Sequence, residues 1–177
     1  MIICCDIHIY MQVPGFSTYL HPIEIDAIPY ILSIGEEWDE DGNFSSSKLT
    51  LFDVSDASLP LVAATHLEKG AYTTAHYDFQ ALRYLPESKT LVIPQSKYNY
   101  DAYDYEFEGF VVYGVSKDEI KPLFNISQDD YSCSYEAYIP ARSFVFESKL
   151  TTIMGHTALS TNLNSMENDW ELDLCIY

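Results

Sequence analysis

Basic residues are scarce in this sequence. Its 177 residues include 9 Lys and Arg against 27 Asp and Glu, which gives a formal net charge of −18 at pH 7. A surface of this sign repels both phosphate backbones and anionic lipid headgroups. We therefore expect no nucleic-acid partner and no docking on an acidic membrane surface.

Long apolar runs are also missing. No stretch approaches the roughly 20 apolar residues of a transmembrane helix, so we expect no membrane insertion. The apolar start, Met1 to Cys5, has no basic segment before it and is interrupted by Asp6 and His8. It is therefore not a convincing signal peptide, and the sequence leaves the compartment open.

Cysteines are few, and none forms a CxxC pair. The four are Cys4, Cys5, Cys133 and Cys175, whose spacing argues against a zinc site of the usual kind. Free buried thiols are the favoured interpretation, with a bond from Cys175 to Cys4 or Cys5 as the alternative. The HExxH, GxSxG and P-loop motifs are missing as well, so no common catalytic motif indicates an enzyme.

What the sequence does contain is a series of short strand-like runs. Hydrophobic residues make up 47% of the chain, enough for a core in one ordinary domain. Runs rich in β-branched and aromatic residues are bounded by Gly, Pro, Asn, Asp and Ser, as strands are. The clearest are 30–34, 48–54, 90–93, 110–113 and 143–146. No segment keeps a helical apolar period over three turns, so we expect an all-β fold.

The strand pattern repeats three times. Residues 31–35 and 50–56 are echoed by 91–94 and 111–117, and more weakly by 151–155 and 158–164. The unit reads as four antiparallel strands, the size of a large propeller blade, with blades over roughly 16–70, 71–135 and 136–177. Between the second and third strands we predict long loops at 36–47 and 95–108. A β-sandwich is the alternative, because strand rhythm alone does not separate the two folds.

One long stretch carries a family resemblance. Residues 13–23, with 30–35 and 48–56, closely resemble the secreted β-propeller domain family distantly related to WD40 repeats, and 81–84, 92–94, 109–112 and 142–143 follow in order. The resemblance implies a propeller fold and an extracellular or cell-envelope location. It implies no settled activity and no catalytic residues.

The number of units is smaller than a propeller needs. About three blades are present, whereas propellers close with four to eight. Three blades leave open sheet edges, which favour pairing or aggregation. The chain is therefore expected to be a fragment of a larger propeller, or to close a ring by assembling with copies of itself.

An acidic segment in the first predicted loop resembles a calcium loop. Carboxylates at alternate positions before Gly42, with an oxygen three residues later, give the candidate ligands Glu37, Asp39, Asp41 and Ser45. A full EF-hand is excluded because its twelfth position is Lys48. The alternative is an ordinary solvated Asp-Gly turn.

A tyrosine-rich segment in the second predicted loop is a candidate contact surface. Tyrosine supplies rigid contact area with a polar tip, and interleaved carboxylates favour a basic protein or a sugar over nucleic acid. The candidate residues are Tyr98, Tyr100, Asp101, Tyr103, Asp104 and Tyr105. The alternative is a hairpin whose tyrosines cover its own face.

Three classes of function follow, in order of preference. The first is a non-enzymatic propeller scaffold that binds a protein or glycan partner. The second is a calcium-dependent extracellular adhesion or binding module. The third, a hydrolase, would use carboxylates such as Asp39, Asp41, Asp101 and Asp104. We expect His21, His66, His76 and His156 to make structural hydrogen bonds, although His76 lies two residues from Asp78.

Overall fold

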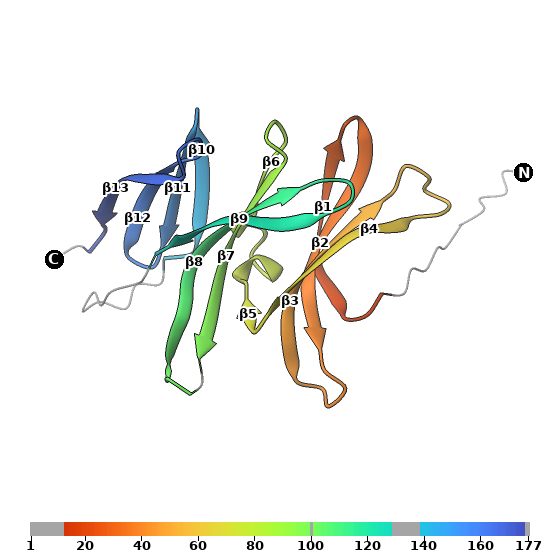
Figure 1. Ribbon diagram of the computed structural model, residues 1–177, viewed down its shortest axis with the longest axis horizontal. Helices are drawn as coiled ribbons and strands as arrows, with labels where there is room; N and C mark the ends of the chain where they lie inside the picture. The colour runs from red at the N-terminus through yellow and green to blue at the C-terminus, as the bar shows by residue number, and fades with distance from the viewer. Residues whose placement is uncertain (1–12, 100, 129–138, 176–177) are drawn as a thin grey trace, which may run out of the picture.

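The described part of the chain is built almost entirely of antiparallel strands. A computed structural model describes residues 13–99, 101–128 and 139–175. Within these ranges thirteen strands and two short 3₁₀ turns occur, and no α-helix. No helix among the described residues has the length and apolarity to cross a bilayer. The strands form three sheets that lie side by side in chain order (Figure 1).

The first sheet is a simple meander of four strands in the order β1-β2-β3-β4. Its strands are β1 (Phe16–Ile25), β2 (Ile28–Trp38), β3 (Phe44–Asp53) and β4 (Leu61–Lys69). The β1–β2 turn places Asp26 and Ala27 at φ 53° and 64°, the left-handed pair that a tight two-residue hairpin requires.

The second sheet follows the same plan, but its first position is shared by two short strands. These are β5 (Ala71–Tyr72) and β6 (Arg83–Leu85), and both pair with β7 (Thr90–Asn99). The chain between them makes two 3₁₀ turns, η1 (Thr74–His76) and η2 (Phe79–Ala81). The sheet continues through β8 (Asp104–Val115) to β9 (Ile120–Ser127).

The third sheet returns to the plain four-stranded order. It consists of β10 (Arg142–Phe146), β11 (Lys149–Met154), β12 (Thr157–Asn162) and β13 (Glu167–Asp173). Here the second and third strands are joined by a tight turn at Gly155 and His156, without the extension seen in the other two sheets.

The core consists of two apolar layers between the sheets. Leu32, Ile34 and Leu51 of the first sheet pack in one buried cluster with Ile93 and Tyr113 of the second. The opposite face of the second sheet forms another cluster with the third, in which Val92 and Phe110 meet Leu150 and Leu159. The middle sheet is therefore covered on both faces, and its strands read as continuous apolar runs for that reason.

The predicted all-β fold class, with three antiparallel repeat units, is confirmed. The predicted long loops are wrong, because β2 and β3 pair as far as Trp38 and Phe44, and β7 and β8 pair as far as Asn99 and Asp104. Most of segments 36–47 and 95–108 is therefore strand. These extensions are rich in Glu, Ser, Asp, Asn and Tyr, so their sequence lacks the apolar alternation that identifies a half-buried strand.

The free-thiol expectation is wrong for one cysteine. Cys175 is disulfide-bonded, and its backbone N–H donates to the Asp173 carboxylate at 2.8 Å. Cys4, Cys5 and Cys133 lie outside the described residues.

Candidate interaction surface at the hairpin end

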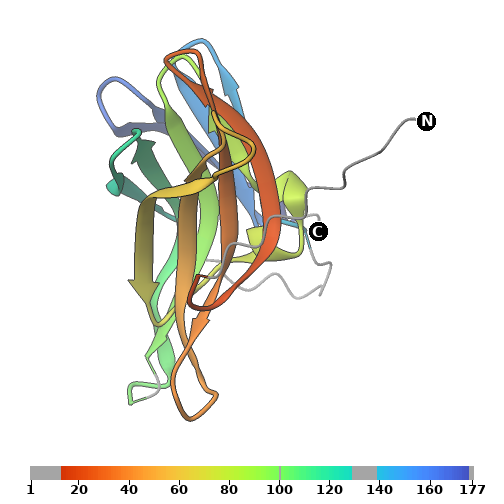
Figure 2. The ribbon, with the colours of Figure 1, turned by 90° about the vertical axis from the view of Figure 1, so that its right-hand side faces the viewer.

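Two long hairpins project from the same end of the molecule. The β2–β3 and β7–β8 hairpins both extend to the lower end in Figure 1, and they point the same way after a quarter turn in Figure 2. The hairpins come from neighbouring sheets, and both tips lie at the same end of the molecule (Figure 1). We call the residues 38–44 and 98–105 the hairpin tips, apart from position 100, which lies outside the described residues.

The β2–β3 tip is a tight turn organised by one carboxylate. Asp39 Oδ1 accepts hydrogen bonds from the backbone N–H of Asp41 at 3.0 Å and of Asn43 at 2.8 Å. The Asn43 side-chain amide also donates to both oxygens of Asp39, at 3.3 and 3.2 Å. These bonds from Asn43, backbone first, hold the pKa of Asp39 below its ordinary value. Gly42 takes φ 80°, which only glycine adopts freely.

The four predicted calcium ligands do not share one arrangement. Asp39 is used by the turn, and Glu37 lies 3.3 Å from Lys48 Nζ in an ion pair. Asp41 is exposed on the turn, and the Ser45 hydroxyl lies 3.3 Å from that of Ser46. Among the described residues no group of three or more His, Cys, Asp or Glu is close enough to hold a metal ion. The geometry matches the Asp-Gly turn alternative, and it leaves calcium binding untested.

Aromatic rings are exposed at both tips. Tyr103 and Tyr105 are 83% and 53% exposed, and Tyr98 packs edge-on against Tyr105 with ring centroids 5.2 Å apart. On the other hairpin, Trp38 is 46% exposed and lies 6.1 Å from the ring of Phe16. Tyr98 and Tyr105 partly cover each other, as expected for a hairpin whose tyrosines cover its own face. The Tyr103 ring remains in solvent.

Tyr103 lies in the turn of its hairpin and has a positive φ. Its φ is 55°, in the left-handed region that costs a non-glycine residue of the order of 1 kcal/mol. Asn99 stabilises the turn by accepting from the backbone N–H of Asp101 and Ala102, at 2.9 and 3.1 Å. Five other non-glycine residues among those described take a similar φ, so the Tyr103 backbone is an ordinary turn conformation.

Carboxylates surround these rings and cations do not. Asp101 and Asp104 flank Tyr103 and are exposed, as are Glu40 and Asp41 at the other tip. No Lys or Arg occurs in either hairpin tip. The nearest cation of the second hairpin, Lys97, is already paired with Glu106 at 3.1 Å. The surface therefore offers flat rings with negative charge between them.

A polar cluster missed by the sequence reasoning joins the two sheets just above the tips. The buried Glu36 carboxylate of β2 accepts from His76 Nδ1 at 3.0 Å and from the Trp38 indole N–H at 3.1 Å. His76 Nε2 lies 2.8 Å from the hydroxyl of Tyr72. In the neutral tautomer that carries its hydrogen on Nδ1, facing the carboxylate, His76 accepts a hydrogen bond at Nε2 from the Tyr72 hydroxyl. Both ring nitrogens are thus engaged, in a contact between strand β2 and the 3₁₀ turn η1.

The other histidine expectations have mixed outcomes. Asp78 does not meet His76 but pairs with Arg142 of the third sheet at 2.7 Å. His21 Nδ1 lies 3.1 Å from the Tyr19 hydroxyl, and burial lowers the pKa of His21. His66 lies 3.3 Å from Glu68 and packs edge-on against Tyr113.

Comparison with known proteins decides the family. The family model described as "Beta propeller domain" matches residues 6–166. The chain belongs to the beta propeller domain family. It is also 32% identical over 111 residues to the uncharacterized protein MJ1554 of Methanocaldococcus jannaschii. That match covers 63% of this chain but only 16% of the relative. No solved structure matches the chain.

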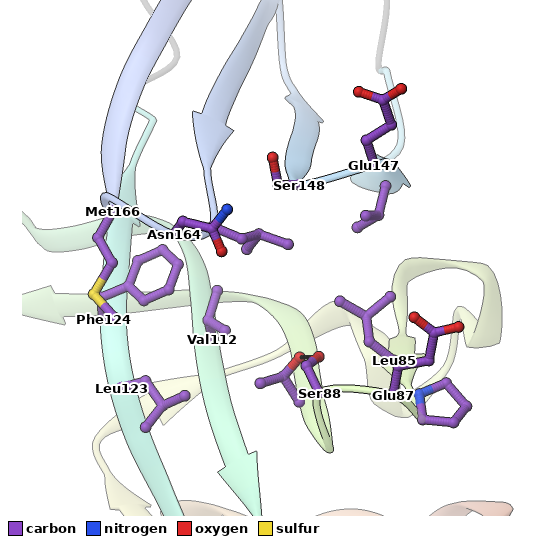
Figure 3. Close-up of a pocket in the computed structure, with 14 residues that line it drawn as sticks. Leu85, Glu87, Ser88, Val112, Leu123, Phe124, Glu147, Ser148, Asn164 and Met166 are labelled. Carbon is purple, nitrogen blue, oxygen red and sulfur yellow. Dashed lines mark hydrogen bonds between the residues drawn. The ribbon is translucent and has the colours of Figure 1, made fainter.

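In propeller terms the three sheets are blades, and a cavity of about 750 Å³ lies between the second and third. Figure 3 shows Phe124 and Met166 gathered at one side of it, with Leu85 and Glu87 at the other. Glu147 points away from the other lining side chains in this view. The walls are mainly apolar, so the cavity resembles a gap between blades more than a site with convergent polar groups.

A buried polar pair lies between the first and second blades. The Tyr113 hydroxyl donates to Gln95 Oε1 at 2.8 Å, and both residues line a cavity of about 410 Å³ with Glu68 and Asn125. Burial, assisted by the negative charge of Glu68, raises the pKa of Tyr113 well above its ordinary value. Tyr113 is therefore held as a neutral donor, which is a structural role.

Proposed function

We propose that this propeller is a non-enzymatic scaffold that binds a basic segment of a protein partner on its hairpin tips. The observation that carries the proposal is that two neighbouring blades extend hairpins from one end, where exposed aromatic rings lie among carboxylates: Trp38 on the first tip, Tyr103 and Tyr105 on the second. An arginine side chain both pairs with carboxylates and stacks on aromatic rings. Such a surface suits arginine-containing chains better than any anionic ligand.

Several features support the tips as the contact surface. Tyrosine is enriched at interface hot spots, because it contributes a large contact area while losing few rotamers. Tyr103 is 83% exposed, so its ring is accessible to a partner. The Glu36–His76 contact joins the first hairpin to the second blade, which reduces the freedom that this hairpin would lose on binding.

The location of the scaffold rests on weaker support. The resemblance to the secreted β-propeller family favours an extracellular or cell-envelope protein. A disulfide at Cys175 is typical of an oxidising compartment. We propose such a location together with the binding function.

Binding of a short fluorescent peptide of alternating arginine and serine tests the proposal by anisotropy. We expect saturable binding that weakens as salt is raised, because carboxylates supply part of the attraction. The double variant Tyr103→Ala/Tyr105→Ala is expected to weaken binding about tenfold, since interface aromatics contribute about 1–2 kcal/mol or more. A lysine peptide of equal charge should bind less tightly because an ammonium lacks the planar fork.

Charge-matched controls separate this surface from the general acidity of the chain. Asp101→Asn/Asp104→Asn and Asp118→Asn/Glu119→Gln remove the same charge, but the second pair lies in the turn at the other end of β8. Only the first should weaken binding strongly. Equal weakening by both pairs, or binding of neutral oligosaccharides through the same tyrosines in place of the peptide, would contradict the proposal.

A further inference from the structure

The cavity of about 410 Å³ between the first two blades contains a buried polar atom without a partner. Gln95 of β7 lines this cavity and is 3% exposed. Its Oε1 accepts from the Tyr113 hydroxyl, whereas its Nε2 has no hydrogen-bond partner among the described residues. A buried amide N–H without an acceptor costs free energy, so most such groups in folded proteins are paired. An acceptor atom held in the cavity would satisfy this one.

Further polar side chains from four strands line the same cavity. Glu68 comes from β4 of the first blade, and Lys97, Glu106 and Asn125 come from β7, β8 and β9 of the second. These four side chains are half-buried or exposed, whereas Gln95 is buried. The cavity therefore has a buried polar floor and a polar rim. The walls of the cavity between the second and third blades, by contrast, are mainly apolar.

The charges of the lining residues favour an uncharged ligand. Glu68 and Glu106 repel an anion, and Lys97 is already paired with Glu106 at 3.1 Å. A cation would be attracted by the carboxylates, but on the floor it would meet the Gln95 amide N–H, which is a donor. The ligand that fits both levels offers an acceptor to the floor and donors to the rim, without a net charge.

Hydroxyl groups meet both requirements, because each one donates and accepts. We propose that this cavity binds one neutral hexopyranose ring. One sugar hydroxyl accepts from Gln95 Nε2, and others donate to the Glu68 carboxylate and the Asn125 side-chain oxygen. The half-buried Phe107 ring, also in the lining, offers an apolar surface to the C–H groups of the sugar. The cavity volume is within the range of small-ligand sites.

This site is separate from the peptide surface proposed above. The described residues that line the cavity do not include Trp38, Tyr103 or Tyr105. Sugar binding should therefore persist in Tyr103→Ala/Tyr105→Ala, the double variant expected to weaken peptide binding. It should also be insensitive to salt, because a neutral ligand gains little from long-range attraction. Failure of one site would leave the other intact.

NMR titration of the isotope-labelled chain tests the proposal. The probes are glucose, galactose and mannose, each as the free sugar and as its methyl glycoside. We expect at least one of these hexoses to shift the side-chain amide signals of Gln95 and Asn125 in a saturable way. Binding of a methyl glycoside would assign the site to the end of a glycan. Binding of a free sugar alone would assign it to a free monosaccharide.

Two variants at the rim, each with a matched control, measure the contribution of the cavity. Asn125→Ala and Glu68→Gln should raise the Kd about fivefold and about tenfold, because each removes or weakens one hydrogen bond to the sugar. Asn164→Ala and Glu87→Gln make the same changes at exposed residues that line the other cavity. These controls should leave the Kd unchanged.

Three results would overturn the proposal. The first is no saturable shift with any of the sugars, since the cavity would then take up water only. The second is a shift of the Gln95 amide by the arginine–serine peptide and not by sugar, which would assign the cavity to the peptide surface. The third is equal weakening by Asn125→Ala and Asn164→Ala, which would mean that the sugar binds elsewhere.

Discussion

At the scale of single residues, the contact of Glu36 with His76 has the clearest structural consequence. The two side chains are 11% and 14% exposed and connect β2 of the first blade to the 3₁₀ turn of the second. Glu36→Gln keeps the shape of the side chain but removes the negative charge to which His76 and the Trp38 indole N–H both donate hydrogen bonds. We expect a loss of about 1–3 kcal/mol in the free energy of unfolding, measured with urea.

A matched change shows whether that loss belongs to the contact. Glu24→Gln removes the same charge from an exposed position on β1 of the same blade, and it should change stability by less than about 0.5 kcal/mol. Equal effects of the two variants would contradict a structural role for the Glu36–His76 pair.

The buried hydroxyl of Tyr113 makes stability depend on alkaline pH. Burial raises the pKa of Tyr113 above its ordinary value of 10.0, so folding favours the protonated form. That contribution is fully present below pH 10 and is lost as the pH rises above the unfolded value. We expect the free energy of unfolding to fall above pH 10. Tyr113→Phe should flatten this fall, whereas Tyr103→Phe at the exposed tip should not, and identical profiles would refute the assignment.

At the scale of elements, the hairpins show what a sequence pattern can and cannot predict. Residues 30–34 and 48–54 were recognisable as strand because apolar residues alternate where one face is buried. The extensions from Glu36 to Ser47 carry Glu, Ser, Asp and Asn, which are typical of loops, although they keep the same ladder. Composition alone identifies the acidic and the tyrosine-rich segments. Only the stacked sheets show that both segments project from the same end of the molecule (Figure 1).

One glycine maintains the pairing at the base of the first hairpin. A Cβ on Gly35 would collide with the backbone carbonyl of Phe16 on the neighbouring strand. Gly35→Ala is therefore expected to cost about 1–3 kcal/mol, as forced overpacking does. Gly114→Ala is the control, because the nearest atoms there belong to the flexible Leu123 side chain and lie 3.2 Å away. A cost at Gly35 no larger than at Gly114 would contradict the register.

The acidic turn of the same hairpin gives a prediction about calcium. The Asp39 carboxylate accepts hydrogen bonds from Asn43 and the turn backbone, and Glu37 forms an ion pair with Lys48. We therefore expect 10 mM calcium to leave the melting temperature unchanged. A site with a dissociation constant of ~1 mM would stabilise by about 1.4 kcal/mol under those conditions. For a chain of this size that shift is several degrees. A rise of that kind, abolished by Asp41→Asn, would restore the calcium-loop hypothesis.

At the scale of the whole molecule, the sequence predicts the repeated unit but not how the three sheets stack on one another. Three copies of one strand pattern predicted three units, and the resemblance predicted their family. Two contacts between blades join residues that are far apart in the sequence: Glu36 and His76 are 40 positions apart, and Asp78 and Arg142 are 64. The cavity between the last two blades is likewise lined by residues from separate repeats. No local sequence pattern identifies the two ion pairs, since each partner alone is an ordinary polar residue.

The central claim is that the hairpin end is the binding surface of this scaffold. Hydrogen–deuterium exchange of the chain, with and without saturating arginine–serine peptide, tests it most directly. We expect slower exchange in residues 36–45 and 96–108 and little change in β10 to β13. Protection confined to other turns, or no protection at peptide concentrations that saturate the anisotropy signal, would contradict it.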